Sequence, residues 1–132
     1  MSGHFATLLR GTVRGMLPGH DVYITDWADM AVTPLHHGDF GLDEYIDLLI
    51  GFIRHLGPDL HIVAVCQPAP IVLATVALMA AEKDPATPRT MTLMGGPIDP
   101  AAAPTVVTEL ARQRSLAWFK SHCVSQVPLF YP

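Results

Sequence analysis

The chain has 132 residues, half of them hydrophobic and only 15% charged, which suits one domain with a buried core rather than a disordered linker. The net charge of −4 argues against binding to nucleic acid or anionic membrane. There is no apolar stretch long enough to span a bilayer and no secretory signal. The two cysteines, Cys66 and Cys123, form neither a metal-binding spacing nor a disulfide framework. We therefore expect a soluble, cytoplasmic protein with reduced thiols.

The first half of the chain predicts two helices and one strand. Apolar side chains recur at helical spacing over residues 5–17, and the sequence LPG ends that helix. Residues 21–27 (DVYITDW) predict a strand, followed by a loop to about Gly41. Residues 42–56 predict a second helix, because apolar residues keep one helix face and acidic residues occupy its first turns.

The second half predicts two further strands and two helices. The β-branched run 61–65 (HIVAV) is typical of a buried strand, and the Ala/Leu/Met-rich run 69–79 is typical of a buried helix. After a polar break at 82–89, residues 90–94 (TMTLM) predict a third strand, which ends at GGP. A last helix is expected from about 105 to 119, whereas 121–132 have no clear period.

Strands that alternate with helices predict an α/β fold with a parallel sheet and flanking helices. Loops at the carboxyl ends of such strands carry active sites. Asp26 and Trp27, Cys66 and Gln67, and residues 95–99 all fall at these ends. A three-stranded sheet covered on both faces is small and has exposed edges, so we expect residues 1–132 to form one domain that is only partial.

Residues 64–68 (AVCQP) join the predicted strand 61–65 to the predicted helix 69–79. A reactive side chain at a tight strand-to-helix turn is the geometry of a nucleophile elbow. Cys66 occupies the nucleophile position, and the N-terminus of the following helix would favour its thiolate. The alternative is that Cys66 fills the core, as buried cysteines often do.

Five segments together resemble the intracellular polyhydroxyalkanoate (polyhydroxybutyrate) depolymerases. They are residues 1–13 (MSGHFATLLRGTV), 23–27 (YITDW), 42–46 (LDEYI), 64–68 (AVCQP) and 93–99 (LMGGPID). The resemblance implies a partial α/β-hydrolase fold in which Cys66 is the nucleophile. It also implies hydrolysis of ester bonds in the amorphous storage polymer of bacterial cells, so the expected partner is the polymer at the granule surface.

The resemblance further implies that the aspartate and histidine of the catalytic triad come later in sequence. The chain is therefore expected to be an N-terminal and central fragment that is inactive alone, with about 121–132 beginning a cap or the missing half. Two alternatives stay open. One is a polyhydroxyalkanoate synthase-like acyltransferase, although its box carries glycines around the cysteine. The other is an inactive granule-associated remnant.

The oxyanion hole needs two N–H donors. Gln67 supplies the first, because the residue after the nucleophile does so in this fold and Pro68 has no N–H. Ser2 and Gly3 are candidates for the second, or they cap the first helix. Asp26 and Trp27 are candidates to line the acyl pocket. The alternative for Trp27 is that it packs against the helices.

Several other residues have a simpler structural explanation. Asp99 is favoured as a turn former, and His61 as a hydrogen-bonded structural group. His36 and His37 lack metal-ligand spacing, and 95–96 (GG) is too short for a phosphate or dinucleotide loop. His122 is next to Cys123, but neighbours in sequence seldom face each other, so surface or cap packing is favoured over a Cys–His pair. No metal and no cofactor are expected.

Overall fold

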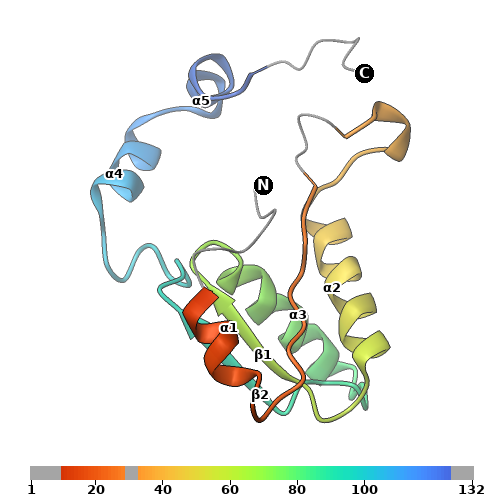
Figure 1. Cartoon of the computed structure of the whole chain (residues 1–132). Coiled ribbons are helices and arrows are strands. Elements are labelled where there is room, and N and C mark those ends of the chain that lie inside the picture. Colours follow the sequence, from red (N-terminus) through yellow and green to blue (C-terminus); the bar gives the residue numbers. More distant parts are fainter. Residues whose placement is uncertain (1–9, 29–32, 126–132) are drawn as a thin grey trace. The chain divides into compact units, whose positions relative to one another are not determined.

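In the computed structural model, residues 10–28 and 33–125 are described. The chain divides into two compact units, residues 1–39 with 125–132 and residues 40–124. Figure 1 labels the helices and strands of both units. The described residues combine helices with a small parallel sheet, which confirms the expected α/β class.

In the first unit, α1 (Arg10–Met16) confirms the predicted helix over the residues that are described. The described part of the predicted loop contains a short 3₁₀ turn, η3 (Leu35–His37). The predicted strand at 21–27 is wrong, since these residues form no strand. Tyr23 and Ile24 are both exposed, and the Trp27 indole N–H donates to the nearby Thr25 hydroxyl (2.9 Å). A β-rich sequence without a buried face or a paired neighbour gains little from the extended ladder.

The second unit begins with α2 (Leu42–Leu56), whose bounds match the prediction. The Gly41 N–H donates to the Glu44 carboxylate (2.8 Å) at the start of this helix. The N–H groups of Glu44 and Gly41 lower the pKa of the Glu44 carboxyl below its usual 4.5. Gly57, at a φ of +88°, ends the helix.

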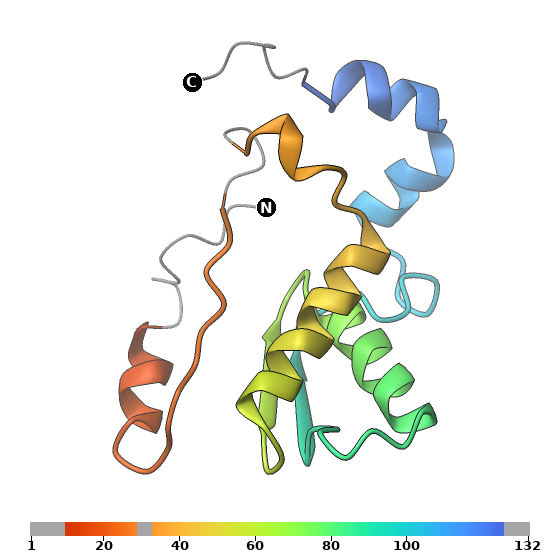
Figure 2. The same ribbon diagram turned by 90° about the vertical axis from the view of Figure 1, so that its right-hand side faces the viewer.

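The sheet of the second unit consists of β1 (His61–Val65) and β2 (Thr90–Met94), which run parallel with Val63 opposite Thr92. The connection between them is α3 (Ala69–Ala81). Figures 1 and 2 show α3 beside both strands, and α3 also packs on α2. The described residues thus form a two-stranded sheet, so the expected third strand at 21–27 is absent from it.

The core of the second unit lies where α3 meets α2 and the sheet. The side chains of Met79 and Thr75 are fully buried there, and the Thr75 hydroxyl donates to the Ile71 carbonyl (2.8 Å). This bond satisfies the buried polar group within its own helix. The other buried residues come from α2, β1 and α3: Tyr45, Ile46, Leu49, Ile53, Ala64, Ala69 and Val72.

The segment between α3 and β2 is tied to α2 through Asp84. The Asp84 carboxylate accepts hydrogen bonds from the Ala86 N–H (2.8 Å) and from Arg54 Nε of α2 (2.7 Å). At the amino ends of the strands, the His61 ring is hydrogen-bonded to the Thr90 hydroxyl (2.7 Å), which confirms its structural role. Arg89 forms an ion pair with Asp59 at the same end of the sheet.

The single helix expected at about 105–119 is wrong, because the chain forms two helices. They are α4 (Val106–Gln113) and α5 (Leu116–His122), separated by Arg114 in an extended conformation. The Ser115 hydroxyl accepts a hydrogen bond from the Trp118 N–H (3.2 Å) and so caps α5. A serine that can begin a new helix competes with continuation of the old one.

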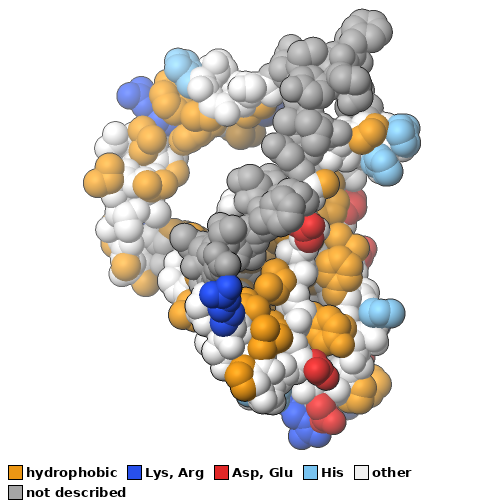
Figure 3. Space-filling model, in the orientation of Figure 1, with side chains coloured by type: hydrophobic (Ala, Val, Ile, Leu, Met, Phe, Trp, Pro, Cys, Tyr) orange, Lys and Arg blue, Asp and Glu red, His pale blue; other side chains and the backbone are white. Residues whose placement is uncertain are grey.

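The described residues bury less apolar surface than the composition predicts. Leu78, Val63 and Met94 are about half exposed, and Val106 is almost fully exposed. Figure 3 shows hydrophobic side chains spread over the visible surface. Two helices on two strands offer few interior positions, which accounts for the difference. Among the described residues, no helix combines the length and hydrophobicity needed to cross a membrane.

Candidate active site

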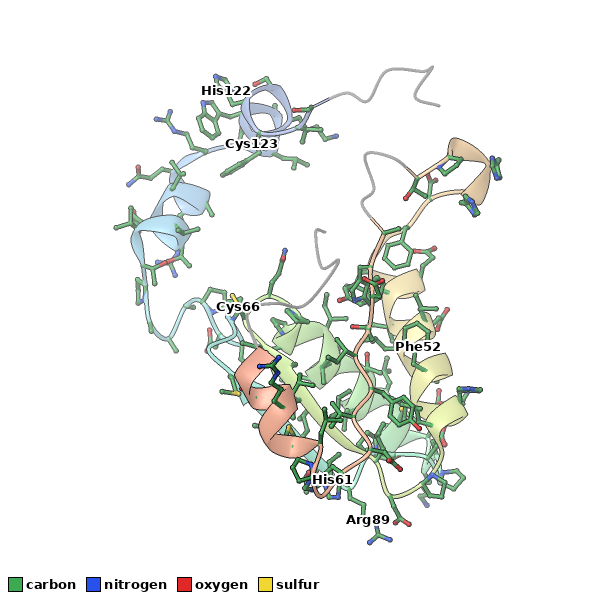
Figure 4. The ribbon with its side chains drawn as sticks, in the orientation of Figure 1. Phe52, His61, Cys66, Arg89, His122 and Cys123 are labelled. Atoms are coloured by element: carbon green, nitrogen blue, oxygen red, sulfur yellow. The ribbon has the colours of Figure 1, made fainter. Side chains whose placement is uncertain are left out.

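Cys66 lies at the carboxyl end of β1, in the turn that leads into α3. Figure 4 shows it at one end of the strand, with His61 and Arg89 at the opposite end. Its backbone has a φ of +66°, which side-chain-bearing residues rarely adopt. The Cys66 N–H donates to the Met94 carbonyl (2.7 Å), and its own carbonyl accepts from the Ala69 N–H (3.1 Å). The residue is exposed, so the core-filling alternative does not describe it.

The turn places Cys66 beside the N-terminus of α3. Pro68 precedes the first residue of this helix and offers no side-chain cap, and Pro70 occupies its second position. The Gln67 N–H makes no hydrogen bond to any described residue, and its side chain is exposed. An uncapped helix N-terminus with an unused N–H favours negative charge, on a thiolate or on a reacting oxygen.

The turn after β2 lies directly against the Cys66 turn. Gly95 has a φ of +62°, and the following residue, Gly96, approaches so closely that a Cβ on it would lie 2.8 Å from the Cys66 carbonyl oxygen. The same Cβ would lie 2.2 Å from the Ala69 Cβ. Sequence reasoning missed this contact, and the signal for it was the glycine pair directly after the strand.

The other sequence-predicted site residues are not brought to Cys66 within the second unit. Ser2 and Gly3 lie outside the described residues. Asp26 and Trp27 belong to the first unit, which is described by itself. Cys66 is a free, exposed cysteine.

Asp99 and His122 take part in local hydrogen bonds. The Asp99 carboxylate accepts from the Ala101 N–H (2.9 Å), which confirms its role as a turn former. The His122 ring stacks on Trp118 of its own helix, with ring centroids 4.5 Å apart. His36 and His37 contact each other on η3. Among the described residues, no group of three or more His, Cys, Asp or Glu side chains is placed to hold a metal ion.

Residues 95–132 match a family model described as the C-terminus of PHB de-polymerase. The match begins at Gly95, so it includes the glycine turn against Cys66 and both α4 and α5. A comparison with curated proteins and one with solved structures give no significant match. The C-terminal part of this chain is thus related to the C-terminal region of PHB (polyhydroxybutyrate) depolymerases.

Proposed function

We propose that the protein hydrolyses ester bonds of polyhydroxybutyrate inside the cell, at the surface of storage granules, with Cys66 as the nucleophile. The observation that carries the proposal is the backbone of Cys66, held at a φ of +66° between a parallel strand and an uncapped helix N-terminus. That is the arrangement of a nucleophile elbow, here with cysteine in place of serine. The match of residues 95–132 to the PHB de-polymerase model supports the substrate class.

In the proposed reaction, the Cys66 thiolate attacks the carbonyl carbon of the ester. The C–O bond then breaks, the leaving alkoxide takes up the proton that the thiol had given up and departs as the alcohol end of the polymer, and the acyl group remains on sulfur as a thioester. Water attacks this thioester, the C–S bond breaks, and the hydroxyacid leaves while the thiol is restored. No metal or cofactor is invoked in either step.

Each tetrahedral intermediate carries a negative oxygen that needs N–H donors. The Gln67 N–H is the proposed first donor, because it follows the nucleophile and has no partner among the described residues. Ser2 and Gly3 are the proposed second donors, and Asp26 with Trp27 are proposed to line the acyl pocket. The fold proposed around these residues is a partial α/β-hydrolase.

The test is hydrolysis of amorphous polyhydroxybutyrate granules by the protein expressed from the whole reading frame that encodes these residues. Wild type and Cys123→Ala should release 3-hydroxybutyrate units or oligomers, whereas Cys66→Ala should be slower by about a thousandfold or more. The Cys123 variant is the matched control, because it also removes one exposed thiol. Undiminished hydrolysis by Cys66→Ala would overturn the assignment, and consumption of a hydroxyacyl-CoA with polymer growth would favour the synthase alternative.

A further inference from the structure

The closest approach between the turn after β2 and the Cys66 turn is made by Gly96. A Cβ built on Gly96 would lie 2.2 Å from the Ala69 Cβ and 2.8 Å from the Cys66 carbonyl oxygen. Both distances are shorter than a Cβ can tolerate, so any side chain at position 96 forces one of the two turns to move. We propose that Gly96 is a positioning residue for Cys66, and the catalytic meaning of this role rests on the proposed function.

Hydrogen bonds hold the Cys66 backbone on both sides, and their partners lie next to the contact between Gly96 and Ala69. Its N–H donates to the carbonyl of Met94, two residues before Gly96, and its carbonyl accepts from the Ala69 N–H. Ala69 is fully buried and is the first residue of α3, so it has no room to move away. A side chain at position 96 would therefore press on the Cys66 carbonyl oxygen, which lies 2.8 Å from the built Cβ, and so on the peptide that sets the direction of the Cys66 side chain.

A merely structural glycine would affect folding and leave the reactivity of the Cys66 thiol unchanged relative to other thiols. Cys123 provides an internal reference, because it is also exposed and is the C-cap residue of α5, an element that packs on none of the other described helices or strands. A positioning role predicts a selective change at Cys66, since the sulfur would move relative to the N-terminus of α3.

The experiment measures the alkylation rates of Cys66 and Cys123 by iodoacetamide in the full chain, resolved by peptide mass spectrometry. Gly96→Ala should lower the ratio of the Cys66 rate to the Cys123 rate by about threefold or more. Gly51→Ala is the matched control, because a Cβ there meets nothing within 4 Å, and it should leave the ratio unchanged.

The double variant Gly96→Ala with Ala69→Gly removes the 2.2 Å overlap and should recover part of the wild-type ratio. If Gly96→Ala does not fold, Ala69→Ser enlarges the same contact from the other side and should lower the ratio in its place. An unchanged ratio in the folded variants, or equal losses at both cysteines, would overturn the proposal. Because alkylation needs no ester hydrolysis, this result is independent of the granule assay: either proposal can fail while the other stands.

Discussion

The backbone of Cys66 has a φ of +66°, a left-handed conformation that glycine adopts far more readily than a residue with a side chain. A residue in this region costs about 1–3 kcal/mol and persists only where its surroundings hold it there. Here the surroundings are the Met94 carbonyl, the Ala69 N–H and the glycine turn, which act on the backbone on both sides of the cysteine. The positive φ of this exposed cysteine supports the proposed nucleophile elbow.

The cost of that conformation can be measured by comparing two small replacements. Cys66→Gly should be more stable to urea unfolding than Cys66→Ala by about 1 kcal/mol, because glycine adopts a positive φ freely. Cys123 is the matched control, since its φ of −118° suits any residue. There Cys123→Gly should be less stable than Cys123→Ala, and the same order at both positions would contradict the account.

At the scale of elements, the sheet and its two helices depend on a polar connection as well as on apolar packing. The Asp84 side chain is only 7% exposed and joins the segment after α3 to Arg54 on α2. The Ala86 N–H, followed by Arg54, lowers the pKa of the Asp84 carboxyl below its usual 3.8. The charged carboxylate is therefore bound more tightly in the folded protein than in the unfolded chain.

The lowered pKa of Asp84 makes the stability of the folded protein depend on pH, and the sign follows from the linkage between proton binding and folding. A lowered folded-state pKa contributes stability that is fully present above 3.8 and is lost as the pH falls below 3.8 toward the folded-state value. Asp84→Asn should thus be less stable than wild type at pH 7, and the difference should shrink as thermal melts are repeated below pH 3.8. Glu82→Gln is the control, because Glu82 is exposed and lies 4.0 Å from Arg54, so its effect should be small at pH 7. A difference that stays constant with pH would contradict this role of Asp84.

The elements with strong local signals were predictable from sequence. The helix at 42–56 and the strands at 61–65 and 90–94 follow from periodicity and β-branching, and the helix at 69–81 follows from its apolar run. Periodicity does not predict the break at Ser115, because the break depends on a serine that caps a new helix. Nor does it show that residues 21–27 form no strand, because a strand needs a neighbouring strand to pair with. The position of Cys66 and Gln67 in the turn between β1 and α3 was evident from the sequence. The contact with Gly96 was not, because it joins residues distant in sequence.

At the scale of the whole molecule, the described residues differ widely in how well they are packed. Within the second unit, the core lies between α2, α3 and the sheet, whereas α4 and α5 of the same unit have no buried residue. Leu116 is 70% exposed and Val107 is 75% exposed, so these helices gain little from burial. The residues matched by the PHB de-polymerase model thus include the least packed described helices.

Hydrogen exchange should reveal this difference directly. Amides of α4 and α5 should exchange faster than those of α3 and β1 by roughly a hundredfold or more, because few buried contacts oppose their local opening. Mass spectrometry of peptides covering 106–122 and 61–81 compares them within one sample, so the core peptide serves as the control. Equal protection of the two peptides would show that α4 and α5 are packed in solution, contrary to the account.

The most direct test of the central claim is the site of acylation. An activated ester, p-nitrophenyl 3-hydroxybutyrate, is mixed with the chain, and the protein is quenched in acid and mapped by mass spectrometry. A 3-hydroxybutyryl thioester should form on Cys66, with release of p-nitrophenolate, and none on Cys123, which is also exposed but lacks a helix N-terminus beside it. Acylation of both cysteines at the same rate, or of Cys123 alone, would contradict the claim that the Cys66 turn is built for nucleophilic attack.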